Sequence, residues 1–350
     1  MTNPIKIAIC TKGRGGHTIS PDGTKRYQAM NPGKIYEKAL KEDMSILDNV
    51  YLFIEPQDVE AYRETYPKWP AKTFIVLGGD NKGLGYSRQT ALLYFQEVEP
   101  TEVMVMLDDD TLVLEQVYKP HPKTGQMRWT GEHRDIYDGI QTMWKYIQTL
   151  PEPTDGSKVA QVGCEYVQMV WSKYPNWPTN NDWVVKRPID AYTDHGYCDC
   201  CVFWWPLVYK EHDIVYDNLP LKCDRDFTAQ VNYKGLAARK IYRFSIDSPL
   251  NGKVAGGCQQ WYKTDGQEHS EVVDLVENKW NKAYPKAELV KFKEKKTSYG
   301  RTSDVKWWWT RLFHARVKNL IQQEVVNLYS FDESIDKYRN LDNYLAGDAE

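Results

Sequence analysis

Short apolar runs alternate with helix-length segments through the first third of the chain, and this alternation limits the folds available to it. Strands are predicted at residues 5–9, 50–54, 74–77 and 103–107. Helices are predicted at 34–47, 59–66 and 86–95, and the polar stretch 15–23 is predicted to be a loop. Strands that alternate with helices typically form a mostly parallel sheet with helices on its faces. The predicted fold class is therefore α/β, with a Rossmann-type sheet flanked by helices.

The remainder of the chain has a different composition. The middle is rich in Trp, Tyr and Pro, and shorter strands are predicted there at 159–162, 184–186 and 201–205. Residues 286–318 are predominantly basic, whereas 319–350 are predominantly acidic. Apolar residues recur every three or four positions from 309 to 328, which predicts an amphipathic helix.

Membrane and secretory segments are not expected. No apolar run approaches the roughly 20 residues needed to cross a bilayer, and the run that ends at Cys10 is predicted to be a buried strand rather than a signal peptide. The seven cysteines are odd in number and have no disulfide-framework spacing. We therefore expect a cytoplasmic protein that contacts no membrane.

Three consecutive carboxylates, Asp108, Asp109 and Asp110, directly follow the apolar strand predicted at 103–107. Ligands of open α/β sheets bind at the carboxyl ends of the strands. Adjacent carboxylates repel one another, and a divalent cation with oxygen ligands would neutralise them. In an extended segment, Asp108 and Asp110 point the same way. An acidic surface turn is the alternative, but the wholly apolar strand favours a metal site.

Four short motifs follow one another in the first 110 residues: Ile-Ala-Ile-Cys-Thr-Lys-Gly-Arg at 7–14, Leu-Phe-Ile-Glu-Pro at 52–56, Lys-Gly-x-x-x-x-Arg at 82–88 and Leu-Asp-Asp-Asp at 107–110. Their order resembles that of GT-A-fold nucleotide-sugar glycosyltransferases. Within that class the chain is most similar to phage glycosyltransferases that attach sugars to hydroxymethylated pyrimidines in DNA. The resemblance extends over residues 5–265 and is clearest before Thr111.

The resemblance implies a GT-A-like fold in which residues 1–115 would bind the nucleotide sugar and 116–265 would complete the same domain and bind the acceptor. The charge distribution and the amphipathic periodicity predict that 266–350 form a basic helical C-terminal extension with an acidic tail. The residues expected to line the nucleoside and diphosphate sites are Thr11, Arg14, Glu55, Lys82, Arg88, Asp108 and Asp109. If the protein is encoded by a phage, its expected location is the cytoplasm of the host cell.

The resemblance also implies a metal ion, Mn²⁺ or Mg²⁺, held by Asp110 and Asp108. The ion would bridge the two phosphates and stabilise the leaving nucleoside diphosphate. Enzymes of this type often have a third metal ligand after the acceptor region. Both His269 and Asn251 are candidates for it, and the sequence does not decide between them.

An inverting transferase needs a carboxylate base that removes the proton of the acceptor hydroxyl. Segment 222–227 resembles the Glu-Asp-x-x-Phe-type element of the family, with Cys223 where Glu is usual. Asp224 is the predicted base and Asp226 its substitute. The alternative is that one of the two only pairs with Arg225. The sequence leaves open whether the reaction inverts or retains the anomeric configuration.

The basic segment near the end of the chain is a candidate nucleic-acid interface. Lys and Arg residues cluster in the sequence near Trp307. Such side chains could contact DNA phosphates while the neighbouring aromatic rings insert as wedges between base pairs. The residues predicted to bind DNA are Lys295, Lys296, Arg311 and Arg316. An amphipathic helix whose basic side chains are merely solvated explains the same pattern equally well.

The expected function is metal-dependent transfer of a sugar from a UDP-sugar to a hydroxyl, with 5-hydroxymethylcytosine in double-stranded phage DNA as the expected acceptor. A glycan or protein acceptor is the nearest alternative, and a non-catalytic carbohydrate- or DNA-binding protein is the second. The transferred sugar is not identified, because candidate sugars differ by one hydroxymethyl group or one stereocentre.

Overall fold

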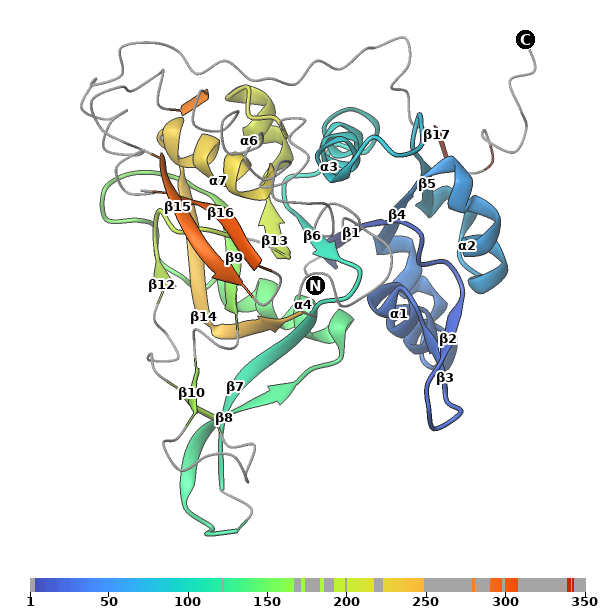
Figure 1. Ribbon diagram of the computed structural model, residues 1–350, viewed down its shortest axis with the longest axis horizontal. Coiled ribbons are helices and arrows are strands. Elements are labelled where there is room, and N and C mark those ends of the chain that lie inside the picture. Colours follow the sequence, from blue (N-terminus) through green and yellow to red (C-terminus); the bar gives the residue numbers. More distant parts are fainter. Residues whose placement is uncertain are drawn as a thin grey trace.

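The computed structural model describes residues 4–120, 123–166, 171–173, 183–185, 192–198, 200–216, 223–248, 279–280, 290–297, 300–307, 339–340 and 342. One large mixed sheet organises this part of the chain (Figure 1). Its strands are β1 (Lys6–Thr11), β4 (Val50–Ile54), β5 (Phe74–Val76), β6 (Met104–Asp108), β7 (Leu112–Pro120), β8 (Met127–His133), β9 (Val159–Tyr166), β12 (Tyr192–Thr193), β13 (Cys201–Trp204), β14 (Ala237–Asp247) and β17 (Arg339–Asn340).

The strands run in the order β17-β5-β4-β1-β6-β13-β9-β14-β7-β8, and β12 pairs with β14. The first half is parallel, since β5, β4, β1 and β6 all run in one direction. The second half is mixed: β13 is antiparallel to both β6 and β9, β14 is parallel to β9, and β7 and β8 follow antiparallel. The α/β class and the mostly parallel sheet predicted from the sequence are confirmed.

Helices cover both faces of this sheet. They are α1 (Met30–Lys41), α2 (Val59–Thr65), α3 (Leu84–Leu93), α4 (Ile136–Ile147), α6 (Pro206–Glu211) and α7 (Cys223–Tyr233), with short 3₁₀ turns at Met44–Asn49, Pro56–Asp58 and Ala71–Thr73 and a π-turn at Tyr94–Val98. Side chains of α3, α6 and α7 pack on one face, and those of α1, α2 and α4 on the other. In Figure 1, α3, α6 and α7 lie along the upper side of the sheet.

The strand sequences explain this two-sided burial. Successive side chains of a strand point to opposite faces, so Met106 of β6 joins the core under α3, α6 and α7 whereas Leu107 joins the core under α1, α2 and α4. Phe203 and Trp204 of β13 divide in the same way. A strand buried on both faces has an uninterrupted apolar sequence, which is why the apolar runs were sound predictors of these strands.

Several predicted elements need correction. Segment 15–23 is not simply a loop, because β2 (His17–Ile19) pairs with β3 (Lys25–Tyr27) in a hairpin. The helix predicted at 34–47 begins earlier, at Met30, and ends at Lys41. The Asp43 side chain then accepts a hydrogen bond from the Ser45 backbone amide and starts a separate 3₁₀ turn.

The C-terminal part also differs from the predicted helical extension. In it, β15 (Val290–Thr297) pairs with β16 (Gly300–Trp307) in an antiparallel hairpin, and β17 pairs with β5 at the edge of the large sheet. Val290 and Phe292 alternate with Lys291 and Lys293, which fits the two-residue period of a strand better than a helix. The helix predicted at 309–328 lies outside the described residues. Two further strands, β10 (Trp171–Lys173) and β11 (Trp183–Val185), pair with each other.

Within the described residues, none of the helices combines the length and the apolar character that crossing a membrane would require.

Candidate functional site

The three aspartates lie where the parallel half of the sheet ends. Asp108 is the last residue of β6 and is in register with Cys10 of β1. The N-terminal turn of α1 holds the backbone beyond it, because the Asn31 amide donates to the Asp109 carbonyl at 2.9 Å and Asn31 Nδ2 donates to the Asp108 carbonyl at 2.6 Å. On the other side of β6, the Asp108 amide donates to the Cys200 carbonyl at 2.7 Å. These hydrogen bonds fix the backbone that carries the carboxylates.

Asp109 points into the protein. Its carboxylate accepts hydrogen bonds from Thr11 Oγ1 and from the Arg14 guanidinium, and the Thr11 hydroxyl lies 2.5 Å from that of Tyr62. Burial raises the pKa of Asp109 to about 7, although the positive charge of Arg14 acts in the opposite direction. Thr11, Arg14 and Asp109, all predicted to belong to one site, are thus in direct contact. Asp109 is therefore buried and helps to hold Arg14, which also binds Asp110.

Asp108 and Asp110 are less buried and each is held by one arginine. Arg88 Nη2 donates to Asp108 Oδ1 at 2.6 Å, and Arg14 Nη1 donates to Asp110 Oδ2 at 2.7 Å. The second oxygen of each carboxylate has no hydrogen-bond partner within the described ranges. Burial raises the pKa of Asp110, Arg14 lowers it, and the negative charge of Asp108 raises it further. The two carboxylates therefore repel each other.

A divalent cation would relieve this repulsion. The described residues contain no group of three His, Cys, Asp or Glu side chains arranged around one metal position. Mg²⁺, however, is usually held by one or two carboxylates together with substrate phosphates and water. Asp108 and Asp110, each with one oxygen to offer, fit that donor set. The candidate third ligands, His269 and Asn251, lie outside the described residues.

Arg88 connects the aspartates with the second half of the sheet. It lies in α3, is only 4% exposed, and its guanidinium lies over the Tyr216 ring at 5.7 Å from the centroid. Burial lowers the pKa of Arg88, but Asp108, Tyr216 and Asp224 all act to raise it, so the side chain stays charged. Arg88 Nε is buried and has no hydrogen-bond partner among the residues that the structure describes.

The other predicted nucleotide-site residues follow the neighbouring strands. Glu55, after β4, is buried; Lys12 Nζ lies 3.1 Å from its Oε1, and Gln57 Nε2 donates to its Oε2 at 2.5 Å. Lys12 Nζ also donates to Asn81 Oδ1 at 2.7 Å. Lys82 is exposed and its chain lies across Gly79, where an added Cβ would be 3.1 Å from Lys82 Cε.

The two candidate bases have different surroundings. Segment 222–227 contributes the start of α7, so both lie in its first turn. Asp226 is completely buried and accepts hydrogen bonds from Lys279 Nζ at 2.7 Å, Trp280 Nε1 at 2.8 Å and Gln230 Nε2 at 2.8 Å. Its ion-pair partner among the described residues is Lys279. These contacts give Asp226 a structural role.

Asp224 is half-buried, and the Tyr197 hydroxyl donates to its Oδ2 at 2.5 Å. Sequence reasoning missed Tyr197. The two residues are 27 positions apart, and nothing in the sequence around Tyr197 marks it as a partner of a carboxylate. Its neighbour His195 is buried, and both of its ring nitrogens are hydrogen-bonded.

The predicted DNA-binding residues are not brought together by the described structure. Lys295 and Lys296 lie on β15, opposite Thr302 and Arg301 of β16. Arg311 and Arg316 lie outside the described residues.

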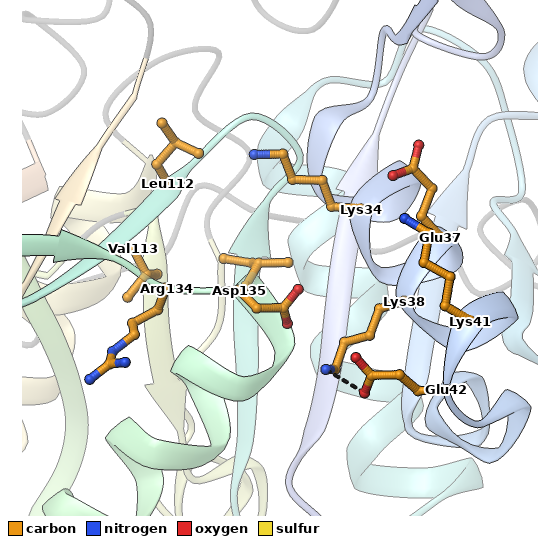
Figure 2. Close-up of a pocket in the computed structure, with 10 residues that line it drawn as sticks. Lys34, Glu37, Lys38, Lys41, Glu42, Leu112, Val113, Arg134 and Asp135 are labelled. Carbon is orange, nitrogen blue, oxygen red and sulfur yellow. Dashed lines mark hydrogen bonds and ion pairs between the residues drawn. The ribbon is translucent and has the colours of Figure 1, made fainter.

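A pocket of about 300 Å³ lies between α1 and the segments where β7 and α4 begin (Figure 2). Its lining consists mainly of charged side chains: Lys34, Glu37, Lys38, Lys41, Glu42, Leu112, Val113, Arg134, Asp135 and Ile136. Lys38 pairs with Glu42 at 2.7 Å and with Asp138 at 3.0 Å. Lys34 and Lys41 form no ion pair with another described residue, and Figure 2 shows the Lys34 amine directed toward Leu112. Leu112, which lines the pocket, is two residues beyond Asp110 in the chain.

No known family model matches this chain, and no curated protein is detectably similar to it. Any function must therefore be inferred from the geometry of the site and from the motif resemblance given above.

Proposed function

We propose that this protein is a metal-dependent glycosyltransferase of the GT-A type. It transfers a sugar from a UDP-sugar to a hydroxyl group, and the acceptor is 5-hydroxymethylcytosine in double-stranded DNA. The observation that carries the proposal is the pair Asp108 and Asp110 at the end of β6. Each is fixed by an arginine and keeps one carboxylate oxygen without a partner among the described residues.

The charge at this edge of the sheet supports a metal-dependent reaction. Asp108, Asp109 and Asp110 are adjacent at the end of β6, so a diphosphate that approached them without a cation would be repelled. Asp108 and Asp110 would hold Mn²⁺ or Mg²⁺, which when bound neutralises the charge that develops on the leaving UDP. Arg88 and Lys82 would bind phosphate oxygens. Glu55 would act on the nucleoside indirectly, by orienting Lys12 and Gln57.

Asp224 is the proposed general base. It accepts the proton of the acceptor hydroxyl while that oxygen forms a bond to the anomeric carbon of the sugar. The bond from this carbon to the diphosphate oxygen breaks, and its electron pair leaves with UDP. Asp224 suits this role because it is half-buried and its Oδ1 has no hydrogen-bond partner among the described residues. The step inverts the anomeric configuration.

A polyanionic acceptor is supported by the pocket shown in Figure 2. Lys34 and Lys41 lie in its lining without an ion-pair partner in the described structure, so they are available to DNA phosphates. A neutral glycan would gain less from these two charges.

The test is mass spectrometry of nucleosides from 5-hydroxymethylcytosine DNA that has been incubated with the protein, Mn²⁺ and a panel of UDP-sugars. We expect a mass gain on hydroxymethylcytosine, none on unmodified cytosine, and loss of the gain with EDTA. Asp110→Asn should lower kcat about 100-fold, because the stabilisation of developing charge is lost. Asp48→Asn, at an exposed ion pair with Lys72, is the matched control and should not change kcat.

The other outcomes separate the alternatives. Release of UDP without modification of DNA would keep the transferase and reject the DNA acceptor. No release of UDP from any donor would reject the enzyme and favour a binding protein.

A further inference from the structure

The segment 192–198 links the candidate base to the hydrogen bonds of the buried His195 ring. Three of its contacts come from elements that are distant in sequence: the loop before β9, helix α7 and strand β14. We propose, on the basis of the function proposed above, that Tyr197 is a positioning residue for Asp224 and that the hydrogen bonds of His195 hold the turn that carries Tyr197.

The first step is the contact between Tyr197 and Asp224. The hydroxyl donates to Asp224 Oδ2 at 2.5 Å, whereas Oδ1 has no hydrogen-bond partner in the described part of the chain. One oxygen is therefore fixed and the other remains able to accept a proton. A general base is effective only when its accepting oxygen is held at hydrogen-bonding distance from the acceptor hydroxyl.

The second step is how the Tyr197 ring is held. The Arg225 guanidinium lies 5.1 Å from the ring centroid and Lys240 Nζ lies 5.3 Å from it. The backbone is fixed as well, because the Gly196 amide donates to the Ala238 carbonyl of β14 at 2.7 Å. Cations beside an aromatic ring are attracted by its electrons, so Arg225 and Lys240 restrict its movement.

The third step is how the His195 ring is held by its partners. Asn232 Nδ2 donates to the Thr228 carbonyl at 3.0 Å, and this orients Asn232 Oδ1 toward His195 Nδ1, 3.0 Å away. On the other side of the ring, His195 Nε2 lies 2.6 Å from Asp155 Oδ2. The buried ring is therefore fixed by a hydrogen bond at each nitrogen.

The fourth step is the location of the two partners. Asn232 lies in α7, the helix that also carries Asp224, and Asp155 lies in the loop before β9. His195 has a φ of 55°, a left-handed conformation that is uncommon for residues other than glycine. The His195 ring thus connects this turn to α7 and to the loop before β9, and the hydrogen bond to α7 fixes the turn that carries Tyr197 relative to the helix that carries Asp224.

The test compares Tyr197→Phe with Tyr192→Phe. Tyr192 lies in the same segment, its ring is over Arg239 at 4.3 Å, and its hydroxyl has no hydrogen bond within the described residues, so it is a matched control. We expect Tyr197→Phe to lower kcat of transfer by about tenfold. KM for the UDP-sugar, Kd for UDP and the melting temperature should stay unchanged. His195→Gln should lower kcat in the same way, with unchanged KM for the UDP-sugar. Tyr192→Phe should behave as wild type.

A kcat for Tyr197→Phe within twofold of that for Tyr192→Phe would overturn this inference, as would a change in KM for the UDP-sugar that accounts for the whole loss of activity. Absence of transfer by the wild-type protein would instead count against the proposed function.

Discussion

At the scale of single residues, helix geometry separates two aspartates that look equivalent in the sequence. Successive residues of an α-helix are rotated by about 100° around its axis, so residues two positions apart lie on nearly opposite sides of the helix. In α7, Asp226 therefore points into the core, toward Lys279 and Trp280, while Asp224 points toward Tyr197. Only one of the two remains available for chemistry.

The pair of Asp155 and His195 also acts at this scale. Burial raises the pKa of Asp155, but hydrogen bonds from Ser157 and His195 outweigh this effect and lower it to about 2. A carboxyl whose pKa is lower in the folded state stabilises the fold above its unfolded pKa, near 4, and this contribution is lost as the pH falls toward 2. About a third of the Asp155 side chain is exposed, and solvent screening limits the contribution to about 1 kcal/mol.

We expect Asp155→Asn to reduce the free energy of unfolding by about 1 kcal/mol at pH 7. The difference from wild type should shrink below pH 4. Urea unfolding at pH 7, 4 and 3 measures it, with the exposed substitution Asp48→Asn as control. A difference as large at pH 3 as at pH 7 would contradict the assignment of this ion pair.

At the scale of elements, α1 has two functions on two of its faces. Its first turn holds the backbone of the aspartates through Asn31, while its exposed face contributes Lys34 and Lys41 to the pocket. The helix is fixed closely to the hairpin before it, because a Cβ on Gly33 would lie 2.1 Å from the Tyr27 ring. The position of the lysines relative to the aspartates is therefore rigid.

We expect the double substitution Lys34→Ala, Lys41→Ala to raise KM for hydroxymethylated DNA about tenfold at low salt and to make this KM less salt-dependent, because fewer counterions are released on binding. Release of UDP in the absence of DNA should not change. Steady-state kinetics at two salt concentrations measure this, with Lys72→Ala as the control for loss of an exposed lysine. An unchanged KM would exclude this pocket from the acceptor site.

At the scale of the whole molecule, the two halves assigned to the donor and the acceptor share one sheet. β6 is hydrogen-bonded to β1 on one side and to β13 on the other. Both cores also draw on both halves, since Met106 of β6 and Trp204 of β13 belong to one cluster and Leu107 and Phe203 to the other. Because they share one sheet and both hydrophobic cores, we expect the two halves to unfold together as one cooperative unit.

We therefore expect residues 1–115 alone not to fold. The fragment would expose the hydrogen-bonding edge of β6 and apolar surface that the second half normally covers, and the apolar burial that remains would not compensate for this cost. Circular dichroism and thermal melting of the fragment measure this. The full-length chain should unfold in one transition. A fragment with native-like secondary structure and a sharp melting transition would show that the donor half is an independent domain.

The sequence was sufficient for the parallel half of the sheet. The strands at 50–54 and 103–107 are buried on both faces, so their apolar runs identify them without knowledge of their neighbours. The aspartates after β6 were found for the same reason, since carboxylates that directly follow a buried strand lie at its carboxyl end. The short polar hairpin of β2 and β3 has no such signal, and its pairing depends on the turn between the strands.

Tertiary structure decided the environment of each polar side chain. The contacts Tyr197–Asp224, His195–Asp155 and Asp226–Lys279 join residues that are 27, 40 and 53 positions apart. Local sequence patterns report how one segment buries its own apolar face. Which carboxylate meets a tyrosine, a histidine or a lysine depends on how distant segments pack together, and only the folded chain contains that information.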